Sequence, residues 1–477
     1  MTRTTLLTNG HLVTMDPGRR VIERGWVAIE DDRIAALGAM DELGERRADE
    51  VIDLGGKLTL PGLVNGHNHH WGSLFKNTGE GLFLEEWIDA VTRPLMAQLS
   101  NDDLEVAAYL GAIEQLRTGT TCSLNHVITV NDHDAMRAMI EPVIDVGVRQ
   151  LVTKELRDTP SPPFSAEHPA RPHVRARNEE VALAEEVVDR WDGAAGRIHM
   201  GLAVETAAHW LLHNTTSQEI IHAGVDLARR RGLKITSHCR SGTPWLSEAE
   251  FRRRTGGGDV DHLARIGALA DNWIFIHVMH VEPREIDHLA RCGASVVTAP
   301  VSNAYSCGGI PPVRALLDAG LTVGLGTDGT YVNCSPDMVE QMKFAALITN
   351  VSHLDPTVLT AERVLEMATI EGARAIGLDH LIGSLEPGKK ADIAVFDLGR
   401  AHTRVANRAV GALVFSAHGT DVDTVLVDGA VVLRDGELVA FGREQEVLAE
   451  ARERARAAIE RAGLADSVFV PWRGAPA

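Results

Sequence analysis

Two histidines at the end of an apolar run have the spacing of metal ligands. His67 and His69 lie in LPGLVNGHNHH, residues 60–70. On a β-strand, residues i and i+2 point to the same face, so the two imidazoles would converge while Asn68 points away. Two neutral imidazoles aimed at one point suit a zinc-like ion. Two structural histidines at a strand end are the alternative for this short motif in isolation.

Three further segments supply the groups that would complete such a site. His238 lies in ITSHC (235–239), His277 in IFIHVMH (274–280) and Asp328 in GLGTDG (324–329). Each has a structural alternative, such as a helix cap or a turn for Asp328. Three imidazoles and one carboxylate form a normal ligand set for a catalytic zinc that keeps a position open for water. A metal-bound water has its pKa lowered to ~7, which makes hydroxide available at neutral pH.

These residues fall at the ends of predicted strands. Between the strands lie amphipathic patterns typical of helices, such as 103–117, 216–231 and 313–320. The alternation predicts a parallel β/α architecture, and eight strands favour a closed (β/α)8 TIM-like barrel with active residues at the carboxyl ends of the strands. An open doubly wound sheet is the alternative, but no G-x-G-x-x-G motif follows an early strand. The predicted strands are 63–70, 119–126, 148–156, 197–204, 233–239, 272–280, 294–300 and 322–328.

Both ends of the chain lack this alternation of strands and helices and contain short strand-like segments instead. Residues 1–60 contain short alternating segments separated by N-G, D-D and G-G turns, and similar segments return at 391–398, 409–417 and 422–438. This pattern predicts a β-sandwich domain assembled from both termini. The expected organisation is the N-terminal part of the sandwich at 1–60, the barrel at 61–380, the C-terminal part of the sandwich at 381–442, and a C-terminal helix and tail at 443–477.

Composition narrows the functional classes. The 477 residues are 44% hydrophobic and carry a formal net charge of −19, which argues against nucleic acid and anionic membranes as partners. The five cysteines contain no C-x-x-C pair and indicate reduced thiols. No signal-peptide pattern is present, and no apolar run approaches the ~20 residues that span a bilayer. We therefore expect a cytoplasmic protein.

The ordered motifs resemble the amidohydrolase superfamily, in the branch of cytosine, guanine and S-adenosylhomocysteine deaminases and triazine hydrolases. The resemblance covers nearly the whole chain. It rests on LPGLVNGHNHH, LFLEEWI (82–88), GTTCSLNH (119–126), the H-x-x-H of IFIHVMH, APVSNAYSCGGIPPV (299–313), VGLGTDG, and the closing segments ATIEGARAIGL and IGSLEPGKKADIAVFD (368–397).

The resemblance implies one divalent metal ion held by His67, His69, His238 and Asp328. His277 would hydrogen-bond the metal water or the attacked centre, and Asp328 would also take the proton of that water. Zinc is the expected ion, with iron(II) or manganese(II) as alternatives. A binuclear site would need a carboxylated lysine after the fourth barrel strand, and RIHMGLAVET (197–206) has no lysine.

One position departs from the pattern of the resembled deaminases. They usually carry a glutamate three residues after the histidine of strand 5, where it shuttles a proton to the ring nitrogen. Here that position is Ser241, and a hydroxyl is a poor acid or base at neutral pH. Glu155 and Glu205 are candidate replacements. In the resembled triazine hydrolases and related enzymes, which expel chloride, an amine or a thiolate, this position varies.

Three functions follow from these observations. The first is a metal-dependent hydrolase that breaks a C–N bond of an N-heterocyclic small molecule, as a deaminase does. The second removes another leaving group, a halide, amine or thiolate, from a triazine, urea or carbamate-like compound. The third is a non-enzymatic barrel relative, against which the intact ligand set argues. A homo-oligomer is expected, and the candidate substrate contacts are Trp87, His126, Glu205, Arg240, Ser241 and Asn303, with Arg157 or Arg240 able to hold a carboxylate.

Overall fold

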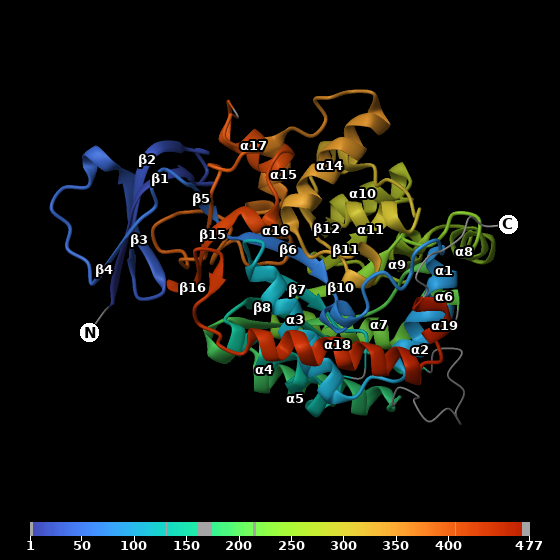
Figure 1. Ribbon diagram of the computed structural model, residues 1–477. Coiled ribbons are helices and arrows are strands. Elements are labelled where there is room, and N and C mark those ends of the chain that lie inside the picture. Colours follow the sequence, from blue (N-terminus) through green and yellow to red (C-terminus); the bar gives the residue numbers. More distant parts are fainter. Residues whose placement is uncertain (1–2, 130, 160–173, 213–215, 406, 470–477) are drawn as a thin grey trace.

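Eight parallel strands form a nearly closed barrel at the centre of the molecule (Figure 1). The computed structural model describes residues 3–129, 131–159, 174–212, 216–405 and 407–469. The strands follow one another around the barrel in chain order: β6 (Leu63–Asn68), β7 (Thr120–His126), β8 (Arg149–Glu155), β9 (Ile198–Ala203), β10 (Ile235–Cys239), β11 (Trp273–His277), β12 (Ser295–Thr298) and β13 (Thr322–Leu325). The predicted (β/α)8 barrel is confirmed.

The two edges of this sheet meet beside the candidate site. The backbone N–H groups of Thr327 and Asp328, just after β13, donate hydrogen bonds to the carbonyl of His67 on β6, at 3.0 and 2.9 Å. The barrel interior is filled by small and branched apolar side chains, including Val64, Leu124 and Ile276. A packed interior leaves the strand ends as the place where polar side chains can gather.

Helices surround the barrel, so the strands are buried on both faces. The helices between β6 and β11 in the chain are α1 (Leu84–Trp87), α2 (Arg93–Met96), α3 (Asn101–Leu116), α4 (His133–Val146), α5 (Arg177–Trp191), α6 (Ala208–Leu212), α7 (Gln218–Arg231), α8 (Ser247–Thr255) and α9 (Asp259–Arg265). The later ones are α10 (Pro283–Cys292), α11 (Pro300–Tyr305), α12 (Val313–Asp318), α13 (Thr330–Asn333), α14 (Met338–His353), α15 (Ala361–Met367) and α16 (Ile370–Ala375). In the described part of the chain, no helix combines the length and apolarity needed to cross a bilayer.

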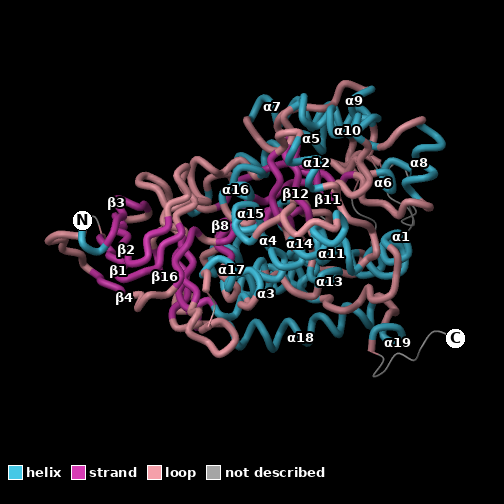
Figure 2. Tube along the Cα trace, turned by 90° about the horizontal axis from the view of Figure 1, so that it is seen from above, coloured by secondary structure: helices cyan, strands magenta, loops and turns pink. Residues whose placement is uncertain are grey.

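A second sheet lies beside the barrel and contains strands from both ends of the chain (Figure 2). Its centre joins the two ends, because β5 pairs with β1 in parallel and with β14 antiparallel. The sheet encloses an apolar core of its own, which includes Leu7, Ile29 and Ile393. Its strands are β1 (Thr4–Val13), β2 (Val21–Glu30), β3 (Arg33–Ala39), β4 (Glu50–Asp53), β5 (Leu58–Pro61), β14 (Ile393–Phe396), β15 (Val422–Val427), β16 (Ala430–Arg434) and β17 (Glu437–Leu438).

One segment expected as a strand is a helix. Residues 409–417 form α17 (Ala409–Phe415), which contacts α15 and α14 rather than the second sheet. A short continuous apolar run has no period that separates a buried strand from a buried helix. At the C-terminal end, α18 (Glu444–Arg461) forms where a helix was expected and packs on α3, and α19 (Ala465–Val468) follows it. The domain boundaries stay a prediction.

Candidate active site

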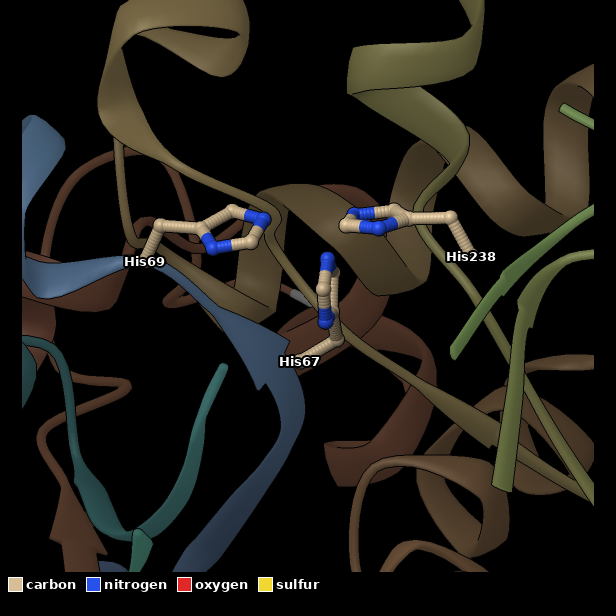
Figure 3. Close-up of side chains that lie close together, drawn as sticks. All are labelled: His67, His69 and His238. Atoms are coloured by element: carbon tan, nitrogen blue, oxygen red, sulfur yellow. The ribbon is translucent and has the colours of Figure 1, made fainter. Parts of the chain in front are cut away.

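Three histidine rings point toward one another at the carboxyl end of the barrel (Figure 3). His67 is on β6, His69 directly follows that strand, and His238 is on β10. The ring centroid of His67 lies 4.7 Å from that of His69 and 5.2 Å from that of His238. One nitrogen of each ring lies within 4.8 Å of the others. The i, i+2 spacing on β6 thus brings two imidazoles to the same point as the third.

Asp328 joins this cluster from the loop after β13. Its Oδ1 lies 3.5 Å from His67 Nε2 and 3.4 Å from His69 Nε2. Its Oδ2 accepts a hydrogen bond from Ser302 Oγ at 2.6 Å. The backbone of Asp328 is left-handed, with φ of 62°, a conformation that is uncommon for non-glycine residues and that aspartate adopts more readily than most. This turn directs the carboxylate to the histidines.

His277, the last residue of β11, also has a left-handed backbone, with φ of 73°. Its Nε2 lies 3.7 Å from Asp328 Oδ2, and its Nδ1 lies 2.8 Å from Asn303 Oδ1. The amide of Asn303 is oriented by a 3.4 Å hydrogen bond from its Nδ2 to Thr298 Oγ1. Asn303 therefore offers its carbonyl to His277, which places the proton on Nδ1 and leaves Nε2 as an acceptor beside Asp328.

Burial sets the charge of these groups. It lowers the pKa of His67 to about 3 and that of His277 to about 4, and it also holds the pKa of His69 well below its usual value. Burial would raise the pKa of Asp328, but the neighbouring imidazoles, His67 foremost, hold it well below the usual range. At neutral pH these imidazoles are neutral and the carboxylate is ionised, the forms that coordinate a metal.

The pKa of His238 shifts the other way. Burial would lower it, but the carboxylate of Glu205 outweighs burial and raises it. Glu205 Oε1 lies 2.8 Å from His238 Nδ1. His69 Nδ1 is likewise engaged, at 2.6 Å from the carbonyl oxygen of His126. Since carboxylate and carbonyl oxygens only accept, both rings carry their proton on Nδ1 and offer Nε2 to the cluster.

The residues present fit a divalent metal. The ring of His67 is fully buried, yet neither of its nitrogens has a hydrogen-bond partner among the described residues. An unpaired buried polar group is costly, and a metal–nitrogen bond would satisfy it. His67, His69, His238 and Asp328 would hold the ion with three nitrogens and one oxygen, and the donor set suits zinc.

A cavity opens above this cluster and contains about 1060 Å³ of space, including its open mouth. Trp210 lies over His238, with ring planes 3° apart and centroids at 5.4 Å, and Trp87 stacks on Tyr331 at 4.8 Å. The walls are mostly apolar, as in sites for small planar ligands. The lining includes His69, Leu84, Trp87, Ile88, Arg93, Met96, Ile128, Arg157, Trp210, His238, Ser241, His277, Met279, Ser302, Asn303, Asp328 and Tyr331.

The other candidate residues divide into two groups. Trp87, Ser241 and Asn303 line the cavity, as does Arg157. His126 and Glu205 lie behind the histidine cluster and are not part of the lining. Arg240 also lies away from it, because its guanidinium is fully buried against Glu248, Glu285 and the carbonyl of His280.

Several cavity residues have no clear signal in the sequence. Ser302 and Asn303 are neighbours in the motif APVSNAYS, and the sequence pattern indicates only Asn303. Tyr331, three residues after Asp328, also lines the cavity without a local signal in the sequence. Trp210 lies on α6 and Arg93 on α2, in βα connections without a local signal.

Comparison with known proteins places this chain in one family. Residues 58–432 match the family described as "Amidohydrolase family". The chain is 34% identical over 443 residues to a 5'-deoxyadenosine deaminase from Methanothermobacter thermautotrophicus, covering 91% of this chain and 95% of that protein. It is 33% identical over 434 residues to a 5-methylthioadenosine/S-adenosylhomocysteine deaminase from Thermococcus onnurineus, with the same coverage.

Solved structures agree in fold. An adenosine deaminase from Xanthomonas campestris with bound zinc has a TM-score of 0.85 and 26% identity, covering 96% of this chain and 98% of its own. An atrazine chlorohydrolase from Arthrobacter aurescens, a mutant complexed with zinc and atraton, has a TM-score of 0.85 and 21% identity, covering 94% of this chain and 100% of its own. The second likeness is one of fold alone.

Proposed function

Because the chain belongs to the amidohydrolase family, whose deaminase-like members hydrolyse C–N bonds of N-heterocycles, we propose that it is a mononuclear zinc-dependent deaminase of an adenine-type nucleoside. The observation that carries this proposal is the convergence of His67, His69, His238 and Asp328 beneath an aromatic-lined cavity. The curated relatives that act on 5'-deoxyadenosine and 5-methylthioadenosine support the substrate class. Iron(II) and manganese(II) are the alternative ions.

The residues of this chain divide the work of the reaction. When bound, a divalent ion would supply a nucleophilic water at neutral pH by lowering that water's pKa to about 7. With the ion bound, the carboxylate of Asp328 would accept a proton from that water, and the hydrogen bond from Ser302 Oγ would hold Oδ2 in place. His277 Nε2 would accept a hydrogen bond from the second O–H of this water and so orient the oxygen lone pair toward the ring carbon. The proton held on Asp328 then passes to the leaving amine.

The cavity walls support a planar substrate with an apolar substituent. Trp210 and Trp87 offer ring faces for stacking, and Leu84, Ile88 and Met96 line the apolar part. Apolar walls exclude water, which strengthens every electrostatic contact made with the reacting atoms. Ser241 hydrogen-bonds the substrate from the place where the resembled deaminases carry a glutamate.

Product analysis tests this function. The zinc-loaded protein is incubated with 5'-deoxyadenosine, 5'-methylthioadenosine, S-adenosylhomocysteine and adenosine, and ammonia and the inosine-type product are measured. Asp328→Asn, which keeps the volume of the side chain but cannot accept the proton, is the matched control. Release of ammonia that depends on Asp328 is the expected result. No ammonia from any adenine nucleoside would overturn the proposed substrate class.

Ser241 favours a second candidate function. A halide or a thiolate is a better leaving group than an amine and needs no proton from a carboxyl at this position, so hydrolysis of such a substituent from a triazine, urea or carbamate-like compound fits the departure. The same assay with chloro-, alkylamino- and methylthio-triazines distinguishes the two, because the released group is identified directly.

We further propose a cytoplasmic homo-oligomer. The scattered free cysteines support the location. Exposed apolar side chains on one side of α14 support the assembly: Leu347, Val351 and the following Leu354 are 52%, 67% and 90% exposed. Sedimentation of the purified chain, with Leu347→Lys as the disrupting variant, measures the state.

A further inference from the structure

Two residues behind the histidine cluster make contacts that no step of the reaction uses. We propose that Glu205 and His126 are positioning residues that hold His238 and His69 in the orientation that binds metal. This inference rests on the proposed mononuclear site. It assigns to the two residues a role that acts through the ligands, since neither lines the cavity where the substrate would bind.

Glu205 follows β9, the strand next to β10, and is 1% exposed. Its Oε1 lies 2.8 Å from His238 Nδ1 and 2.8 Å from His126 Nε2. Its other oxygen, Oε2, is buried without a hydrogen-bond partner among the described residues. Among the described residues, the side-chain hydrogen bond of this carboxylate is to His238, and His126 Nε2 lies against the same oxygen without hydrogen-bond geometry.

His126 ends β7, which lies three strands from β10 around the barrel. Its ring nevertheless packs beside that of His238, with centroids 4.7 Å apart and planes 28° apart. Its backbone carbonyl accepts the hydrogen bond from His69 Nδ1 at 2.6 Å. His126 thus holds His69 through a hydrogen bond, and it supports His238 through ring packing and through its close contact with Glu205.

These contacts have a defined physical effect on a ligand. A histidine that donates its Nδ1–H to a carboxylate or carbonyl keeps Nε2 deprotonated and aimed at the metal. A charged acceptor also makes the ring a stronger donor to the ion. Loss of such a partner typically weakens metal binding by about 10- to 100-fold. Glu205 and His126 together would pre-orient two of the three histidine ligands.

Metal binding tests the inference without any substrate. Apo protein is prepared with a chelator, and zinc affinity is measured by competition with a chromophoric chelator for the wild type, Glu205→Gln and Glu205→Leu. Gln keeps an acceptor but removes the charge, and Leu removes both. We expect affinity to fall about tenfold for Gln and further for Leu. Cobalt(II) substitution should shift the visible absorption bands in the same order, because those bands follow ligand strength and geometry.

Matched variants separate positioning from other roles. Glu155→Gln removes an equally buried carboxylate on the neighbouring strand β8, where Glu155 contacts Arg157 rather than an imidazole, and it should keep zinc affinity within about threefold of the wild type. Wild-type affinity and an unchanged cobalt spectrum in Glu205→Gln would overturn the proposal. If that variant kept the metal but lost turnover, Glu205 would be a proton carrier instead. Wild-type affinity in His67→Ala would refute the metal site itself.

Discussion

Ser241→Ala is the perturbation that most directly tests how this site handles the leaving group. Ser241 lines the cavity and is 4% exposed, and its hydroxyl makes no hydrogen bond to a described side chain or backbone group. The substitution therefore leaves no buried partner unsatisfied, and the free energy of unfolding should change by less than about 0.5 kcal/mol. In the bound state, the variant loses one neutral hydrogen bond of about 1 kcal/mol, which corresponds to a roughly fivefold lower kcat/KM.

Steady-state kinetics on the metal-loaded protein measure this effect, and Ser302→Ala provides the comparison. Ser302 also lines the cavity, but its Oγ donates to the Asp328 carboxylate at 2.6 Å. A hydrogen bond to a charged group is about twice as strong as a neutral one. The kcat/KM of Ser302→Ala should therefore fall by about 10- to 100-fold. A loss of a thousandfold or more in Ser241→Ala would refute the reasoning, because it would assign proton transfer or nucleophilic chemistry to Ser241.

The remaining predictions concern the metal, the orienting histidine and the cavity wall. One ion per chain should be measured by metal analysis, with activity abolished by chelation and metal lost in His67→Ala and Asp328→Ala; two ions, or none in active protein, would contradict the mononuclear site. His277→Asn should retain the metal and lose turnover by about 10²-fold or more, whereas loss of metal would make His277 a ligand. Glu85 of α1 accepts a hydrogen bond from the backbone of Thr243 at 2.8 Å, so Glu85→Gln should raise KM several-fold with little change in kcat; an unchanged KM would show that the contact does not shape the cavity.

The barrel could be predicted because its signal is local and repeated. Each strand is a short apolar run followed by a polar residue, and parallel closure then brings those residues to one end. His238 and His277 illustrate this, since β10 and β11 pair in register and place Cys239 opposite His277. The barrel topology therefore brings together side chains that are more than two hundred residues apart in the chain, such as those of His67 and Asp328.

Arg240 shows where local sequence fails. It follows the ligand His238 by two residues, which in an extended strand would place both side chains on the same face. The strand ends at Cys239, however, and Arg240 has a left-handed backbone with φ of 47°. The side chain turns to buried carboxylates, including Glu248 and Glu285, that come from later helices. No pattern within HCRS could indicate a partner supplied by tertiary packing.

The position of a carboxylate around the barrel decides what it can do. A glutamate in place of Ser241 would face the cavity and could exchange a proton with a bound ring, as in the resembled deaminases. Glu205, one strand away, instead meets the far nitrogen of His238, so any effect it has on the reaction passes through that imidazole. Among the described residues that line the cavity, Asp328 is the only carboxylate, and its pKa is held well below the usual range. Both proton transfers of a deamination must in that case use Asp328, and a leaving group that needs no proton would place less demand on it.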